Sequence, residues 1–258
     1  MTAALLQLEF GKWLRLSSVR FSLLLLVLLP VLWAYAPGIF DVYGVFIVSG
    51  YQVPALSLLS GMEFLFPLLV AIISAELIGS EIAYGTLRAV LLRPVTRAQW
   101  LLAKMGVAVV LPFMLLGFVL LVSLLAGLFY GYGGFVGGTG LGAGGLVGQG
   151  LTAPGEAVQE LLRAYLVAGY SLVPVSLLAL LLTVVFMNAA SGALATLGIL
   201  IISGLLVVFT FLSPFLPTTQ LNAYLAAGQQ LVTPLILITV YALLFALLAV
   251  MTFERKDF

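Results

Sequence analysis

Six long apolar segments dominate this chain and restrict it to a membrane fold. Their approximate bounds are 21–37, 58–80, 101–130, 162–187, 193–216 and 231–253. Each comes close to the roughly 20 apolar residues that a helix needs to cross a hydrocarbon core about 30 Å thick. Charged residues make up only 7% of the chain, whereas soluble domains are roughly a quarter charged. The sequence therefore predicts an all-α polytopic membrane protein with six transmembrane helices in a single domain, 1–258.

The basic residues fall almost entirely on one side of this predicted topology. Six spans place both termini on the same face, and nine of the ten Lys and Arg residues lie there, with only Arg163 on the other face. Basic residues concentrate in cytoplasmic loops. We therefore expect a multi-pass protein of a prokaryotic cell membrane with both termini in the cytoplasm.

The residues before the first span form a second pattern. Leu6, Phe10 and Trp13 fall on one helical face and the charged residues on another. This pattern predicts an interfacial helix within 1–19, and the alternative is a frayed leader that continues into the first span. We expect that span to be a retained anchor rather than a cleaved signal peptide, because Pro37 would follow the cleaved bond.

A glycine-rich segment is predicted on the outer side, within 131–160. Residues 131–150 contain eleven glycines and no charge, which favours a flexible connection. The spacing within 140–145 matches G-x-G-x-x-G, but no strand precedes it and an outer loop would not meet a cytosolic nucleotide. Residues 154–163 have Pro near their start and acids in their first turns, so we expect a short helix that leads into the fourth span.

The residue inventory excludes several chemistries. Cysteine and histidine are both absent, which removes disulfides, thiolate nucleophiles, Cys/His zinc sites and Ser-His dyads. Asp41 and Asp257 are the only aspartates and stand near opposite ends, so an aspartyl dyad is not expected. The net charge of +1, without a basic run among aromatics, gives no indication of nucleic acid binding. We expect no metal site and no cofactor bound by this chain.

A charged segment at 81–100 separates the second and third spans. With the start of the third span it contributes five of the nineteen charged residues, namely Glu81, Arg88, Arg93, Arg97 and Lys104. The pattern predicts a short helix from Ala83 to Leu92, a bend imposed by Pro94, and a new helix that starts at Thr96 or Arg97. An ordinary loop whose arginines bind phospholipid headgroups would explain the charges but not this order of residues.

This segment resembles the corresponding segment of ABC-2 type transporter permeases. The residues that carry the resemblance are, in order, Glu81, Gly85-Thr86-Leu87-Arg88, Leu91-Leu92, Pro94, Arg97 and Lys104. Six spans, cytoplasmic termini and an interfacial N-terminal helix are also similar to that family. The resemblance implies a coupling helix that sits in a cleft of a separate ATP-binding subunit and transmits ATP-driven dimerisation to the spans. The implied ATPase-coupling interface comprises Glu81, Gly85, Thr86, Leu87, Arg88, Arg93, Pro94 and Arg97.

The resemblance also implies an assembly. Two ABC ATPase subunits and a second permease, identical or different, would join this chain among membrane lipid. The only Gly-Lys pair, Gly11-Lys12, precedes Trp13, so the chain has no Walker A motif. ATP and Mg would bind to the partner, and this chain would not be an enzyme. The implied function is export of a hydrophobic or amphipathic cargo; the alternatives are a secondary transporter or channel independent of an ATPase, and a non-transporting membrane scaffold.

Glu63 and Glu76 form the candidate outer gate or intramembrane polar site. If the second span begins near Pro54, Glu63 lies inside the bilayer, where an ionised group costs roughly 2.5–3.5 kcal/mol on insertion scales. If the span begins at Phe64, Glu63 lies at the outer mouth and Pro67 falls in the first turn, where proline is tolerated. We favour the outer mouth.

Overall fold

The six predicted spans are present as helices. The computed structural model describes residues 11–12, 16–35, 46–86, 96–138, 140–142, 144–226 and 228–256. In this part of the chain six helices are long and apolar enough to cross a membrane. They are α2 (Ser17–Tyr35), α5 (Leu65–Ala83), α7 (Arg97–Gly127), α8 (Pro154–Phe186), α9 (Ala189–Leu206) and α11 (Val232–Glu254). The all-α polytopic fold is therefore confirmed.

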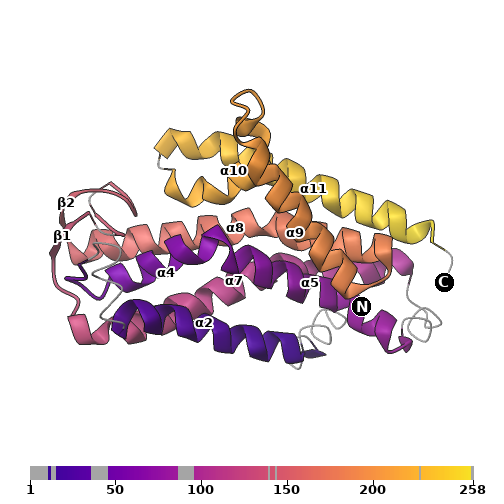
Figure 1. Ribbon diagram of the computed structural model, residues 1–258, viewed down its shortest axis with the longest axis horizontal. Helices are drawn as coiled ribbons and strands as arrows, with labels where there is room; N and C mark the ends of the chain where they lie inside the picture. Colours follow the sequence, from indigo (N-terminus) through magenta and orange to yellow (C-terminus); the bar gives the residue numbers. More distant parts are fainter. Residues whose placement is uncertain are drawn as a thin grey trace.

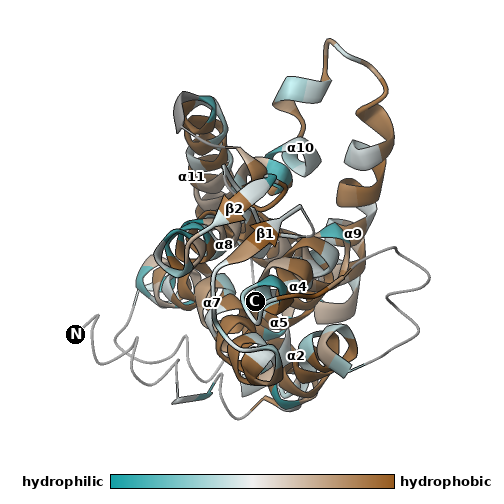
Figure 2. Ribbon diagram, turned by 90° about the vertical axis from the view of Figure 1, so that its left-hand side faces the viewer, coloured by the Kyte–Doolittle hydropathy of each residue, from teal (hydrophilic) through white to brown (hydrophobic). Residues whose placement is uncertain are grey.

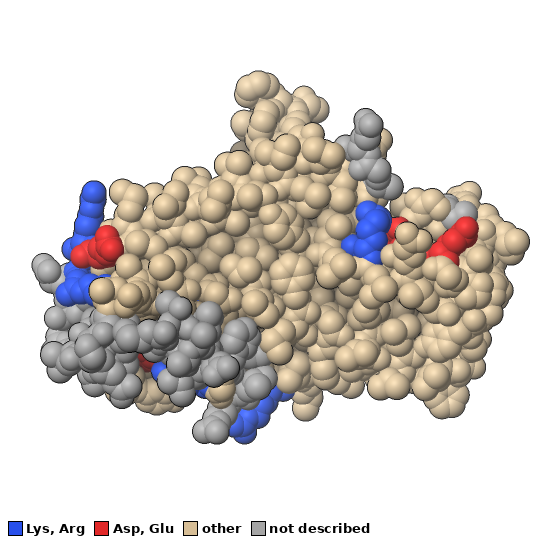
Figure 3. All heavy atoms as spheres, turned by 180° about the vertical axis from the view of Figure 1, so that it is seen from behind, with Lys and Arg blue, Asp and Glu red and all other residues tan. Residues whose placement is uncertain are grey.

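Most of the long helices run roughly along the longest axis of the molecule, whereas α9 is inclined to it (Figure 1). The start of α2 and the end of α11 lie toward one end, whereas the short strands lie at the other. On the face shown in Figure 3, charged side chains are few and lie toward the two ends and at the lower edge, and the upper middle of this face is uncharged. The helices are hydrophobic along most of their length (Figure 2), and many large hydrophobic side chains on them are exposed. This distribution suits helices that cross a bilayer along the long axis.

Helix α8 is the centre of the bundle and packs against α5, α7, α9 and α11. A buried polar link joins three helices there: the hydroxyls of Ser74 and Ser176 are 2.7 Å apart, and the Ser176 hydroxyl donates to the carbonyl of Ala108 at 2.7 Å. Without water to compete, such bonds fix neighbouring helices in register.

Two glycines set the position of α9. A Cβ on Gly79 of α5 would lie 2.3 Å from the Cβ of Ala189, and a Cβ on Gly192 of α9 would lie 2.3 Å from Oγ1 of Thr183 in α8. These contacts leave no space for a side chain. Small residues thus let α9 approach both α5 and α8 closely.

Two spans differ from their predicted bounds. The second is divided into α4 (Gln52–Glu63) and α5, with Phe64 between them at φ −150° and ψ −47°. Helix α9 ends at Leu206 rather than near 216, because the chain turns back after it through short helices. These are η2 (Ser213–Phe215), α10 (Pro217–Leu221), η3 (Asn222–Leu225) and η4 (Gly228–Leu231).

The glycine-rich segment is folded rather than a flexible connection, so that expectation is corrected for the described residues. After η1 (Leu128–Tyr130), strand β1 (Phe135–Gly137) pairs antiparallel with β2 (Gly150–Thr152). The aliphatic and aromatic residues between the glycines anchor it, since Phe135, Leu141 and Leu146 are buried in the main core. The predicted short helix after it is the start of α8, which continues without a break into the fourth span.

Candidate functional site

A buried ion cluster lies where α5 ends. The Glu81 Oε1 atom accepts from Lys104 Nζ at 2.8 Å and from Lys12 Nζ at 3.0 Å. The side chains of Glu81 and Lys104 are 11% and 3% exposed, whereas Lys12 is 56% exposed. We call these three residues the Glu81 cluster. Because the Lys104 charge is removed from solvent, the Glu81 carboxylate is needed to stabilise it.

Aromatic residues close one side of this cluster. Lys104 Nζ lies 5.5 Å from the ring centroid of Trp100, and Trp100 stacks on Phe253 of α11 at 5.2 Å between centroids. Both rings are almost fully buried. The Glu81 Oε2 and Trp100 Nε1 atoms are buried and make no hydrogen bond to the described residues. The cluster therefore joins α5 to α7, and the stacked rings extend this contact to α11. One acceptor and one donor remain without a hydrogen bond among the described residues.

The chain leaves α5 through a tight turn. Gly85 adopts φ +67°, its N–H donates to the carbonyl of Ile82 at 3.0 Å, and the Thr86 hydroxyl donates to the carbonyl of Glu81 at 3.3 Å. A positive φ favours glycine, so Gly85 ends the helix in the manner of an αL cap. The predicted short helix from Ala83 to Leu92 therefore does not begin at Ala83, which belongs to α5. Thr86 is helical after the turn, and the rest of that prediction lies outside the described residues.

The chain enters α7 through a capping box. Thr96 Oγ1 accepts from the N–H of Gln99 at 3.2 Å, and Gln99 Oε1 accepts from the N–H of Thr96 at 3.3 Å. These reciprocal bonds satisfy two donors at the helix start. The prediction that a helix starts at Thr96 or Arg97 is confirmed.

Lys256, two residues after the end of α11, links the start of α7 to the end of α8. The Arg97 Nη1 atom donates to the carbonyl of Lys256 at 2.7 Å. Lys256 Nζ in turn donates to the carbonyls of Val184 and Val185, at 2.7 and 2.6 Å. A lysine at the carbonyl end of a helix also favours the helix dipole. Arg97 thus has a structural partner within the chain.

Part of the predicted coupling interface lies at two helix ends. Glu81, Gly85 and Thr86 lie at the end of α5, and Arg97 lies at the start of α7. Leu87, Arg88, Arg93 and Pro94 lie outside the described residues, as does most of the predicted interfacial helix. Sequence reasoning missed the partner roles of Lys12, Trp100 and Lys256. A lysine inside an apolar span was the available signal for Lys104, because such a charge requires a partner.

Glu63 and Glu76 do not share a site. Glu76 accepts a hydrogen bond from the hydroxyl of Ser18 in α2, whereas Glu63 is the last residue of α4, beside the break at Phe64. The apolar helix that is long enough to span a membrane starts at Leu65, just after Glu63. Glu63 therefore ends α4, whereas Glu76 lies within α5 and is bonded to α2, and no contact between the two carboxylates joins them among the described residues.

These features define a class: a polytopic helical membrane protein with a buried ion cluster beside the basic segment that connects two of its spans. Sequence comparison then gives the family. Residues 5–153 match the ABC-2 family transporter proteins, and the chain belongs to that family. It is a membrane permease component of an ABC transporter rather than the ATPase. The family implies association with ABC ATPase components. No curated protein matches this chain.

Proposed function

We propose that this chain is the permease subunit of an ATP-driven exporter for a hydrophobic or amphipathic substrate. In the proposed assembly it pairs with a second permease, and two ATPase subunits bind ATP and Mg on the cytoplasmic side. The segment 81–100 is the coupling region. The permease itself holds no cofactor.

The anchoring of this segment at both ends is the observation that carries the proposal. Residues 87–95 connect the turn at Gly85 to the capping box at Thr96. Across that connection the Glu81–Lys104 ion pair ties α5 directly to α7. A displacement of the segment by an ATPase would therefore move two spans together, instead of being absorbed in a slack loop.

The contacts of Arg97 extend this linkage to the remaining helices. Its bond to the carbonyl of Lys256 reaches α11, and Lys256 reaches the end of α8. Helix α8 in turn packs against α9. Motion delivered at one basic loop can thus act on most of the bundle. The three arginines of the segment match the acidic surface that we propose for the ATPase cleft.

Charge reversal in a reconstituted complex with the cognate ATPase tests the proposal. Arg88→Glu should leave insertion intact but weaken ATPase association and substrate-stimulated hydrolysis. Loss of a desolvated charge pair costs about 2–5 kcal/mol, against about 1 kcal/mol for an arginine at a lipid surface. Arg97→Glu should do the same but also disturb the tail at Lys256.

The matched control is Arg255→Glu, since Arg255 is exposed just beyond the end of α11. This reversal should keep at least half of the coupled activity. Full coupled transport by both the Arg88 and Arg97 variants would show that the segment does not couple to an ATPase.

A further inference from the structure

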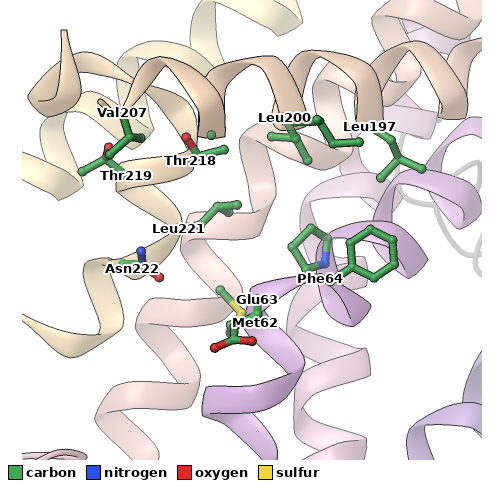
Figure 4. A pocket seen from close by; sticks show the side chains of 13 residues that line it. Met62, Glu63, Phe64, Leu197, Leu200, Val207, Thr218, Thr219, Leu221 and Asn222 are labelled. Atoms are coloured by element: carbon green, nitrogen blue, oxygen red, sulfur yellow. The ribbon is translucent and has the colours of Figure 1, made fainter. Parts of the chain in front are cut away.

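A cavity of about 490 Å³ separates the break in the second span from the arm formed by α9 and α10. Its walls are mainly aliphatic and aromatic, and include Met62, Phe64, Leu197 and Leu200 (Figure 4). The volume lies within the roughly 300–1,000 Å³ range of small-molecule sites. The cavity is therefore large enough for an organic molecule and too apolar to favour a hydrated ion.

One carboxylate stands in this cavity. Glu63 lines it, is exposed, and forms no ion pair or hydrogen bond with the part of the chain that the structure describes. Arg163, the basic residue of the outer side, is held by Glu160 and by the carbonyls of Tyr224 and Ala226. Among the described residues no cation neutralises the Glu63 carboxylate, which leaves its charge available to a cationic ligand.

The remaining polar groups of the cavity lie on α10 and just after it. Thr218, Thr219 and Asn222 line it, and the Thr219 hydroxyl is buried without a hydrogen-bond partner among the described residues. Nearby, burial and then the Glu63 carboxylate raise the pKa of Tyr224 to about 12, so that phenol stays neutral. The net character of the site is one negative charge in an apolar enclosure, with a few neutral polar groups.

We propose that this cavity binds a lipophilic organic monocation, whose charge pairs with Glu63 and whose apolar part packs on α5 and α9. This inference rests on the proposed function, because it names the substrate class of the transporter. An ion pair within apolar walls is stronger than the same pair in water. A neutral or anionic amphiphile would leave the carboxylate unpaired, so Glu63 is the residue that sets selectivity for positive charge.

Equilibrium binding of radiolabelled tetraphenylphosphonium to the full chain, purified in detergent without an ATPase, tests this proposal. Glu63→Gln should weaken binding about tenfold, equivalent to about 1.4 kcal/mol, whereas Glu63→Asp should keep most of it. Glu254→Gln is the matched control, because Glu254 is exposed at the far end of α11. Unchanged binding in Glu63→Gln would overturn the proposal.

A second pair of variants tests the cavity independently of charge. Gly204 lines the cavity and Gly198 does not, although both belong to α9 and have open space where a Cβ would stand. Gly204→Leu should fill the cavity and weaken binding about tenfold, while Gly198→Leu should change it less than twofold. Equal effects of the two leucines would place the cation elsewhere.

Tetraphenylborate, which has nearly the same shape and the opposite charge, should bind the wild-type chain at least about tenfold more weakly than tetraphenylphosphonium when each radiolabelled ion is measured in a separate sample. Equal affinities of the two ions would show that the site selects only for hydrophobicity and would overturn the role of Glu63. Because no ATPase is present, these results are separate from the coupling test. If the wild-type chain does not bind tetraphenylphosphonium but ATP hydrolysis in the complex still depends on Arg88, the proposed substrate class is rejected and the proposed function stands.

Discussion

The Glu81 cluster allows a quantitative test of how this permease holds α5 against α7. In Lys104→Met the side chain keeps its packing against Trp100 but loses the charge that lies 2.8 Å from Glu81. The carboxylate would then be buried with Lys12, which is 56% exposed, as its remaining partner in the cluster. Breaking a buried pair costs about 3–5 kcal/mol. Since Lys12 compensates in part, we expect a loss near the lower limit, about 3 kcal/mol.

A double-mutant cycle separates the ion pair from other effects of Lys104. Glu81→Gln combined with Lys104→Met removes both charges, so the double variant should recover about 2 kcal/mol relative to Lys104→Met alone. Lys12→Met should cost at most about 1 kcal/mol, because an exposed partner contributes little. Unfolding free energy in micelles, measured by steric trapping, provides the assay. If the double variant is as unstable as the single one, Lys104 stabilises the fold by packing and the cluster is not an electrostatic unit.

Three further predictions concern topology, helix packing and capping. A single cysteine that replaces Arg93 should react with reagents from the cytoplasm, and one that replaces Gly140 only with reagents from outside. The chain has no native cysteine, so no other site would be labelled. Labelling of both positions from the same side would reject the topology. Gly79→Ala should cost about 1–3 kcal/mol by overpacking against α9, whereas Gly198→Ala should be neutral or stabilising; equal stabilities of the two variants would contradict this close contact. Thr96→Ala should cost about 1 kcal/mol through loss of the cap and lower coupled hydrolysis, and unchanged hydrolysis would separate the cap from coupling.

The number of spans follows from the sequence because apolar length is a local property. Each segment must satisfy its backbone within its own helix in a bilayer, so about 20 apolar residues are enough to predict it. The end of α9 was harder to predict from the sequence. Residues 207–216 are still largely apolar, and only the turn before Pro217 shows that the helix has already ended.

Partners distant in sequence account for what could not be predicted at the site. Glu81 and Lys104 were both visible in the sequence, but their contact depends on how α5 and α7 pack. The break at Phe64 was partly accessible, because Pro67 is compatible with a helix that starts just before it, but the separate helix α4 ahead of the break was not predicted. Glycines such as Gly142 have little local preference, so their folded path depends on the buried residues between them and on close backbone approaches.

The bond between Arg97 and Lys256 has a consequence for biogenesis. The two residues are 159 positions apart, so α7 enters the membrane long before the ribosome has made the end of α11. Until then, the start of α7 lacks both the Lys256 carbonyl and the Phe253 ring that covers Trp100. A partly synthesised permease therefore lacks the finished arrangement at this end of α7. Under the proposed coupling, an ATPase that recognises this arrangement would engage only chains whose last helix has been inserted.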